Sequence, residues 1–551
     1  MKKISSIKTI PLKPLKNNFY LYIAVILVGI FSYIFSYYSV RKYLSLNAYG
    51  YDLGVQVQIY ASTLHNEFFY STLINQSYLS QHFSPFVFVI FIFYYLFPSP
   101  ETLLIIQAVT ISLAAIPLFL ISRELLLRSN ASNNVSGIIS LIIATSYLIS
   151  PYVESPITFD FHVMIFLSLF LFLSFYFFLK GMWVLDGIFI GLIVSLHSEY
   201  AVVAIFVIMI QYFFLHRFPY HLYQLKGLKK ILLQRSTLVS LLSIIMLVLY
   251  FLMIPLVKES ISRNTASGHI ASIVTVDLPA GGVVGLLHDI IFNPNVFIAF
   301  LTYQFHLKEV YFLNAFADTG FLAFLSPFSL LPAIPYIAVA SFSKYTSYYQ
   351  IGWQYTPMII PVIYLSTVLT IFKLYTYVKK IHKKNIEVKV KKIVTIILIF
   401  ILLFSMVFEF TSSPIAPLSI YHKEGVMDDL NTFHTSNGSK IAFAFEKKIR
   451  NSDPYLLTIN NLFPVYAYDY NAYMTIDNTS HLEYLIKNYR FEYIVNQPRS
   501  VQANEGNPTL NELTGNSTYM SHYGLYMASY GQSSVLVYKL NYTSQPTCII
   551  G

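Results

Sequence analysis

Long apolar stretches recur along this chain, and the first of them reads FYLYIAVILVGIFSYIFSYYSV at residues 19–40. An α-helix needs about 20 such residues to cross the hydrocarbon core of a bilayer. Only 11% of the residues are charged, whereas soluble domains carry about 25%. The sequence therefore predicts an all-α polytopic membrane domain.

The apolar stretches predict about eleven transmembrane helices, although several stretches are shorter than a simple span requires. We expect these helices at residues 19–40, 102–121, 137–150, 163–179, 184–197, 199–215, 237–257, 310–325, 328–342, 354–375 and 393–411. The segment SPFVFVIFIFYYLF at 84–97 does not fit the count as a full crossing. We expect it to be re-entrant or interfacial.

Lys and Arg residues indicate the orientation of the chain in the membrane. A basic leader, residues 1–18, precedes the first span, which lacks a small-residue cleavage site and should remain as an anchor. The basic segments 216–235 and 373–392 fall on the same side as this leader, as the positive-inside rule requires. We expect a multi-pass protein of the cell membrane with a cytoplasmic N-terminus. The net charge of +10 is then mainly a topology signal facing anionic lipid, and it indicates no nucleic-acid partner.

The pattern changes after residue 411. The stretch SKIAFAFEKKIRN at 439–451 predicts a helix, and short runs within 454–459, 491–496 and 533–542 predict strands. We therefore expect residues 412–551 to form a small α/β domain, which the topology places outside the cell.

Polar and ionisable residues gather near the ends of the predicted spans on the outer face, where an unused charge is costly. They come from four separate segments: Asp52, Gln56 and His82; Asp160 and His162; His197 and Glu199; and Gln350, Gln354 and Tyr355. The predicted position of all four segments on the outer face of the membrane is the main physical indication of a functional site.

Each group also has a structural interpretation. Asp52 lies between Gly50 and Gly54, as turn or cap residues do. Asp160 could cap the following helix, and His82 could be an interfacial residue. The set Gln350, Gln354 and Tyr355 has the spacing of one helix face and fits polar packing. His197 and Glu199 lie between two apolar runs.

Other chemistries find little support in the sequence. It contains no P-loop, dinucleotide fingerprint, zinc-protease motif or nucleophile elbow. Cys548 is the single cysteine, which excludes an intrachain disulfide. Asp52, Asp160 and His162 are candidate ligands for Mg²⁺ or Mn²⁺, but their spacing does not require a metal.

The motifs GYDLGVQVQIYASTLHNEFFYST, LSQHFSPFVFVIFIFYYLF and FDFHVMIFL resemble those of a family of uncharacterised archaeal and bacterial multi-pass membrane proteins. The similarity runs from about residue 47 to 500 and includes QYTPMIIP and LLTINNLFPVYAYDYNAY. The family more often has Lys-Glu-Asp where this chain has His197-Ser198-Glu199.

That family in turn resembles the GT-C glycosyltransferases, which include the protein O-mannosyltransferases. The resemblance implies a GT-C-like membrane domain and transfer of a sugar from a polyprenyl-phosphate donor. Asp52 then matches the first acidic position and Asp160 the second, and His82 replaces a lysine that approaches the lipid phosphate. Asp52 would serve the acceptor, whereas Asp160, His162 and His82 would position the donor phosphate or hold a cation. The remaining candidates for substrate binding are Gln56, His197, Glu199, Gln350, Gln354 and Tyr355.

Two other functions remain open. A transporter or lipid flippase would commonly show internal repeats, and we find none that is convincing. A non-catalytic scaffold that displays a sugar-binding C-terminal domain would not need the outer groups to converge.

Overall fold

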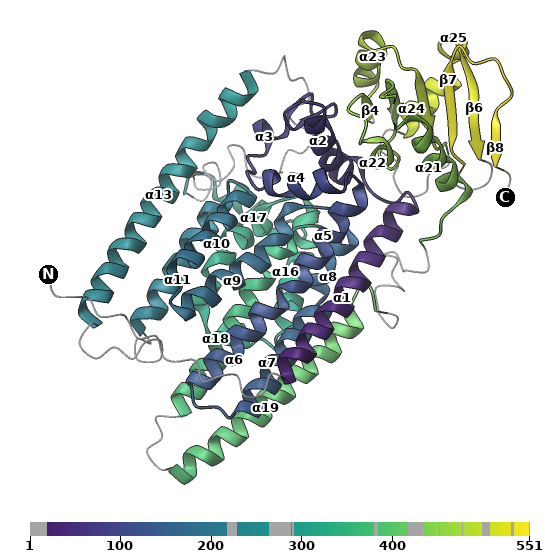
Figure 1. Cartoon of the computed structure of the whole chain (residues 1–551). Helices are drawn as coiled ribbons and strands as arrows, with labels where there is room; N and C mark the ends of the chain where they lie inside the picture. The colour runs from purple at the N-terminus through teal and green to yellow at the C-terminus, as the bar shows by residue number, and fades with distance from the viewer. Residues whose placement is uncertain are drawn as a thin grey trace.

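The computed structural model describes residues 19–217, 229–263, 288, 291–378, 384–416, 433–450, 452–476, 478–498, 507–529 and 534–549. The basic leader and parts of the two basic loops, 218–228 and 379–383, lie outside the described residues. The chain forms a bundle of helices and a separate C-terminal domain beyond one end of that bundle (Figure 1).

The bundle is built from long apolar helices. Its first half contains α1 (Phe19–Leu44), α5 (Pro100–Leu113), α6 (Ala115–Arg128), α7 (Asn133–Ile149), α8 (Pro151–Thr158), α9 (Phe166–Lys180), α10 (Trp183–Leu196) and α11 (Tyr200–Arg217). Its second half contains α13 (Lys229–Arg263), α15 (Pro294–Thr302), α16 (Phe305–Ala317), α17 (Ile334–Phe342), α18 (Ile360–Val378) and α19 (Lys384–Ser412). Seven helical stretches are long and apolar enough to cross a membrane in the described part of the chain. Four shorter apolar helices accompany them. The predicted multi-pass helical domain is confirmed, and the count of about eleven spans stays a prediction.

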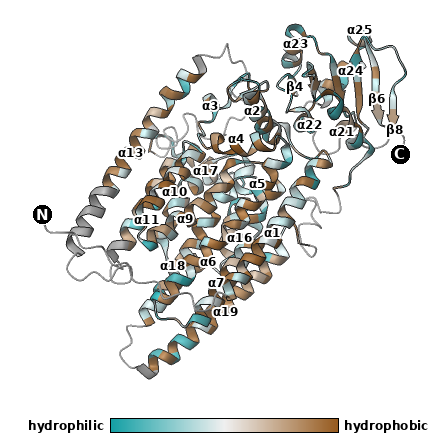
Figure 2. Ribbon diagram, viewed as in Figure 1, coloured by the Kyte–Doolittle hydropathy of each residue, from teal (hydrophilic) through white to brown (hydrophobic). Residues whose placement is uncertain are grey.

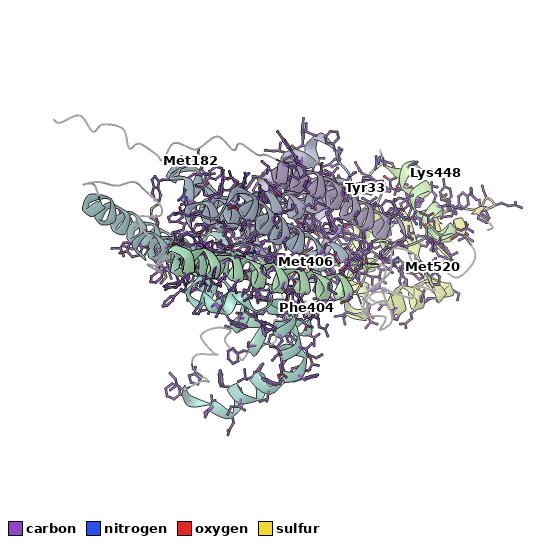
Figure 3. All side chains as sticks on the ribbon, turned by 90° about the horizontal axis from the view of Figure 1, so that it is seen from below. Tyr33, Met182, Phe404, Met406, Lys448 and Met520 are labelled. Atoms are coloured by element: carbon purple, nitrogen blue, oxygen red, sulfur yellow. The ribbon has the colours of Figure 1, made fainter. Side chains whose placement is uncertain are left out.

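The outer surface of the bundle is apolar. Brown, hydrophobic ribbon covers the long helices, whereas the C-terminal domain carries much more teal (Figure 2). Tyr33 of α1 and Phe404 of α19 are 72% and 69% exposed, and both are labelled on these helices in Figure 3. Exposed aromatic side chains on such helices are expected where lipid is the solvent.

The segment predicted at 84–97 forms α4 (Val87–Leu96), which has ten residues. At 1.5 Å per residue this helix is about 15 Å long, half of what a crossing needs. It lies across the end of the bundle nearest the C-terminal domain (Figure 1). The expected re-entrant or interfacial placement of this segment in a membrane stays a prediction.

The predicted spans 310–325 and 328–342 form an interrupted hairpin. Helix α16 ends at Ala317, because Gly320 and Phe321 adopt left-handed φ angles of 57° and 60°. Two 3-10 segments, η3 (Leu322–Leu325) and η4 (Pro327–Ala333), then form its tip before α17. A side chain at Gly320 would meet Ile401 of α19 at 2.3 Å, so the turn depends on this glycine.

Shorter elements lie between the long helices on the side of the C-terminal domain. They are η1 (Gly50–Gly54), α2 (Val55–Leu64), β1 (Tyr70–Ser71), β2 (Gln76–Ser77), α3 (Tyr78–Gln81), η2 (Val163–Ile165), η5 (Thr346–Tyr349) and η6 (Thr356–Met358). Asp52 lies in η1 and Gln56 in α2, whereas His82, His162, Gln350 and Tyr355 directly flank α3, η2, η5 and η6.

The C-terminal domain contains a six-stranded mixed sheet in the order β4-β3-β5-β7-β6-β8. Its strands are β3 (Leu456–Thr458), β4 (Ala472–Met474), β5 (Tyr493–Asn496), β6 (Tyr523–Ser529), β7 (Leu536–Leu540) and β8 (Thr547–Ile549). Its helices are α21 (Asn437–Ile449), α22 (Phe463–Tyr466), α23 (Thr479–Asn488), α24 (Asn507–Gly515) and α25 (Ser517–Met520). The predicted helix and three predicted strands correspond to α21, β3, β5 and β7.

Candidate functional site

Asp52 lies in η1, a single turn of π-helix, an element that often marks functional sites. The glycines on either side of it allow the C-terminal domain to approach. A side chain at Gly54 would meet Cδ1 of Phe463 at 2.4 Å, and one at Gly50 would meet Sδ of Met474 at 2.4 Å. These glycines therefore allow close packing rather than forming an ordinary turn around the acid.

Polar contacts hold this segment against the C-terminal domain. The amide of Gly50 donates to Oδ1 of Asn460 at 2.6 Å, and Nε2 of Gln58 donates to the carbonyl of Ala472 at 2.9 Å. Asn460 is buried. The C-terminal domain thus fixes the backbone that carries Asp52.

The imidazole of His162 reaches this carboxylate. Its Nε2 lies 3.0 Å from Oδ1 of Asp52, and both side chains are partly exposed. The His162 ring stacks on Phe159 with a centroid separation of 5.6 Å. The backbone amide of His162 donates to Oε1 of Gln107 on α5 at 2.9 Å. Packing and backbone contacts therefore orient the ring toward Asp52.

Asp160 is buried, with 1% of its surface exposed. Nζ of Lys42 lies 3.2 Å from its Oδ1, and the amide of Tyr49 donates to its Oδ2 at 2.6 Å. Burial raises the pKa of Asp160, the Lys42 charge counteracts the shift, and the charge of Asp52 adds to it. Asp160 therefore joins α1 to the segment that carries Asp52. It does not cap the next helix as one interpretation expected.

His82, His197 and Glu199 form a second group of contacts. Nδ1 of His82 lies 3.3 Å from Nε2 of His197, whose own Nδ1 contacts Oε2 of Glu199. Burial, together with His197 and Lys258, lowers the pKa of His82 to about 3. The structure thus holds His82 in its neutral form at pH 7. His162 also lowers the pKa of His82.

The ring of Tyr78 lies 5.2 Å from that of His82, between centroids. Burial raises the pKa of Tyr78 to about 12, and the charges of Asp52 and Glu199 add to the shift. Burial, with Tyr348, Tyr345 and Asp52, raises the pKa of Tyr355. Tyr348 and Tyr355 are 4.4 Å apart between ring centroids.

The three glutamines predicted to bind substrate differ in burial and in their contacts. Gln56 is buried, and its Oε1 lies 3.4 Å from the Tyr60 hydroxyl. Gln354 is buried, and its Oε1 has no hydrogen-bond partner among the described residues. Gln350 is half-buried just after η5. The expected helix face is wrong, because Gly352 has a φ of 97° and the backbone turns between these residues.

The candidate metal ligands do not form a cluster in the described part of the chain. Among the described residues, no three His, Cys, Asp or Glu side chains converge as metal ligands would. The contacts of Asp160 are with Lys42 and the Tyr49 amide, and that of Asp52 is with His162.

Sequence reasoning missed Lys42, Gln107 and Asn460 as parts of this site. Lys42 had one signal, since it is a basic residue at the outer end of the first span, where the positive-inside rule disfavours it. Gln107 and Asn460 had none, because only the fold brings them to His162 and Gly50.

Comparison with known proteins gives a family. No curated protein matches the chain. Two crystal structures of ArnT from Cupriavidus metallidurans are similar to it. The structure bound to undecaprenyl phosphate has 12% identity and a TM-score of 0.46, covering 94% of this chain and 98% of that one. The apo structure has 13% identity and a TM-score of 0.42, with coverages of 95% and 97%. The family model described as "Predicted membrane protein (DUF2079)" matches residues 42–534, and the chain therefore belongs to this family of membrane proteins.

Proposed function

We propose that this protein is a glycosyltransferase that moves a sugar from a polyprenyl-phosphate donor to an acceptor hydroxyl at the outer face of the membrane. The observation that carries the proposal is the contact between Asp52 and His162, beside a second group of polar side chains at the same end of the bundle. The motif resemblance to GT-C enzymes supports the reaction class.

Asp52 is the general base in this proposal. It takes the proton of the acceptor hydroxyl as that oxygen bonds to the anomeric carbon of the sugar. The bond between this carbon and the phosphate oxygen breaks, and the oxygen keeps the electron pair as the lipid phosphate leaves. His162 donates from Nε2 to Oδ1 of Asp52 and orients this carboxylate, and the partial exposure of Asp52 supports access by an acceptor.

Asp160 is a positioning residue rather than a ligand of the donor phosphate. Both of its oxygens have partners within the protein, and the residue is buried. It orients Tyr49, which directly precedes η1, and so helps to place Asp52.

The donor phosphate is assigned to the second group. Its negative charge needs hydrogen bonds or positive charge as it leaves. His82 and His197 supply imidazole nitrogens, and Lys258 at the outer part of α13 acts on His82 with its charge. We assign Lys258 as the cation that the motif lacks at position 82, because α13 packs against α3, which ends directly before His82.

A transfer assay tests the proposal. Purified full-length protein is given a radiolabelled polyprenyl-phosphate hexose and a membrane extract as the source of acceptor, and labelled product is counted. Lys258→Gln should raise the KM for the donor, whereas Lys440→Gln, an exposed change in the C-terminal domain, should leave it unaltered. An absence of transfer by the native protein with several hexose donors would contradict the proposal and favour the transporter or scaffold.

A further inference from the structure

An apolar cavity of about 380 Å³ lies far from the candidate site. Its walls come from the last turns of α11, the first half of α13, the 3-10 segment η4 and α18. Helices α11 and α13 stand side by side at the edge of the bundle (Figure 1). The volume of the cavity is within the usual range for small-molecule sites.

The cavity belongs to the opposite half of the membrane domain. Helix α18 begins near the site, where Thr356 donates to the carbonyl of Tyr152 at 2.6 Å. Lys373 lies further along this helix, about 20 Å from Ile360 at the usual helical rise. The cavity is therefore separate from the place where we assign the sugar donor.

Among the described residues of this mostly apolar wall, Lys373 is the cation. Lys373 lines the cavity together with Phe213 and Phe328, whose rings stack at 5.1 Å. Its Nζ donates to Oγ of Ser326 at 2.9 Å. Ionisable residues inside a membrane domain are costly and usually functional, and Lys near a helix end reaches toward the headgroups.

We infer that this cavity binds an anionic phospholipid of the adjacent leaflet, with a hydrocarbon chain in the cavity and the phosphate at Lys373. The positive charge of Lys373 favours an anionic headgroup, and the apolar walls favour a hydrocarbon chain. The basic residues of the sequence concentrate at this face of the membrane, where anionic lipids are the expected neighbours. The distance from the candidate site favours a bilayer phospholipid over the polyprenyl phosphate.

Native mass spectrometry tests the inference. Full-length protein is reconstituted in vesicles of equal phosphatidylcholine and phosphatidylglycerol, extracted in neutral detergent, and the retained lipid is counted. The native protein should retain phosphatidylglycerol in preference, and Lys373→Gln should retain it about fivefold less, the effect of one Lys near an anionic surface. Lys373→Arg should retain it as the native protein does.

Two further variants separate the cavity from general surface attraction. Ser329→Trp fills the cavity and should lose the lipid although Lys373 remains, whereas Lys391→Gln on α19 should not. Thermal unfolding in phosphatidylcholine alone shows whether each variant is folded. If Lys373→Gln is unfolded, lipid retention by Ser329→Trp tests the inference instead. Equal retention by Lys373→Gln or by Ser329→Trp would overturn the inference. So would equal loss in Lys391→Gln, or preferential retention of added polyprenyl phosphate.

Discussion

Nε2 of His162 lies 3.0 Å from Oδ1 of Asp52, although the two residues come from different connections between membrane helices. The contact depends on parts of the chain that are distant in sequence. Gln107 holds the backbone of His162, and Asn460 of the C-terminal domain holds the backbone beside Asp52. The geometry therefore belongs to the whole fold.

The buried pair of Lys42 and Asp160 should be strongly coupled. Lys42→Met leaves an unpaired buried carboxylate, so we expect a loss of about 3–5 kcal/mol in the free energy of unfolding. Unfolding in detergent measures it, and the double variant Lys42→Met/Asp160→Asn should recover part of the loss. The half-buried i,i+4 pair of Lys391 and Glu387 on α19 is the control, because Lys391→Met should cost only about 0.3–0.5 kcal/mol. Additive losses in the double variant would show that the buried pair is not a unit.

Gly54→Ala should disturb the site through the C-terminal domain. The new Cβ would lie 2.4 Å from Cδ1 of Phe463, so the ring or the π-helical turn must move. Overpacking of this kind costs about 1–3 kcal/mol, and displacement of Asp52 should lower sugar transfer. Gly187→Ala on α10 is the matched control, since nothing lies within 4 Å of its added Cβ. Unchanged stability and transfer in Gly54→Ala would mean that the domain does not fix this segment.

Some features of this protein follow from its local sequence, and others depend on contacts between distant parts of the chain. The apolar runs, α4 and the helix α21 follow from local composition and periodicity, so residue patterns are enough to find them. The C-terminal end of α16 was missed because a left-handed turn at Gly320 and Phe321 depends on packing against α19. The Asp52 segment was noticed through its polarity, but its partners come from elsewhere in the chain. Nothing local in the sequence shows that Lys42 pairs with Asp160.

His82 should make the protein sensitive to mild acid. Its pKa is about 3 in the folded protein and 6.5 ordinarily, so between these values the unfolded chain binds a proton that the folded protein does not. Its contribution to stability is complete above about pH 6.5 and is lost as the pH falls toward 3. His82→Gln should therefore flatten the fall in the thermal midpoint between pH 7 and pH 5. His306→Gln is the control because this side chain is 85% exposed. A native-like fall in His82→Gln would refute the assignment.

Cys548 allows the topology to be tested without new cysteines. It is the single cysteine of the chain and is exposed on the C-terminal domain. A membrane-impermeant maleimide should label it in intact cells, because the basic loops place this domain outside. Cys548→Ser should remove the labelling. Labelling that needs permeabilised cells would place the domain, and every candidate site residue, on the other side.

The most direct measurement of the central claim compares sugar transfer by the native protein and by Asp52→Asn. The amide keeps the size of the side chain and removes its basicity, so kcat should fall by about 10²-fold or more, the usual scale for a general base. Thermal unfolding should be nearly unchanged, because Asp52 is partly exposed and such substitutions usually alter stability little. Native rates of transfer by folded Asp52→Asn would contradict the account.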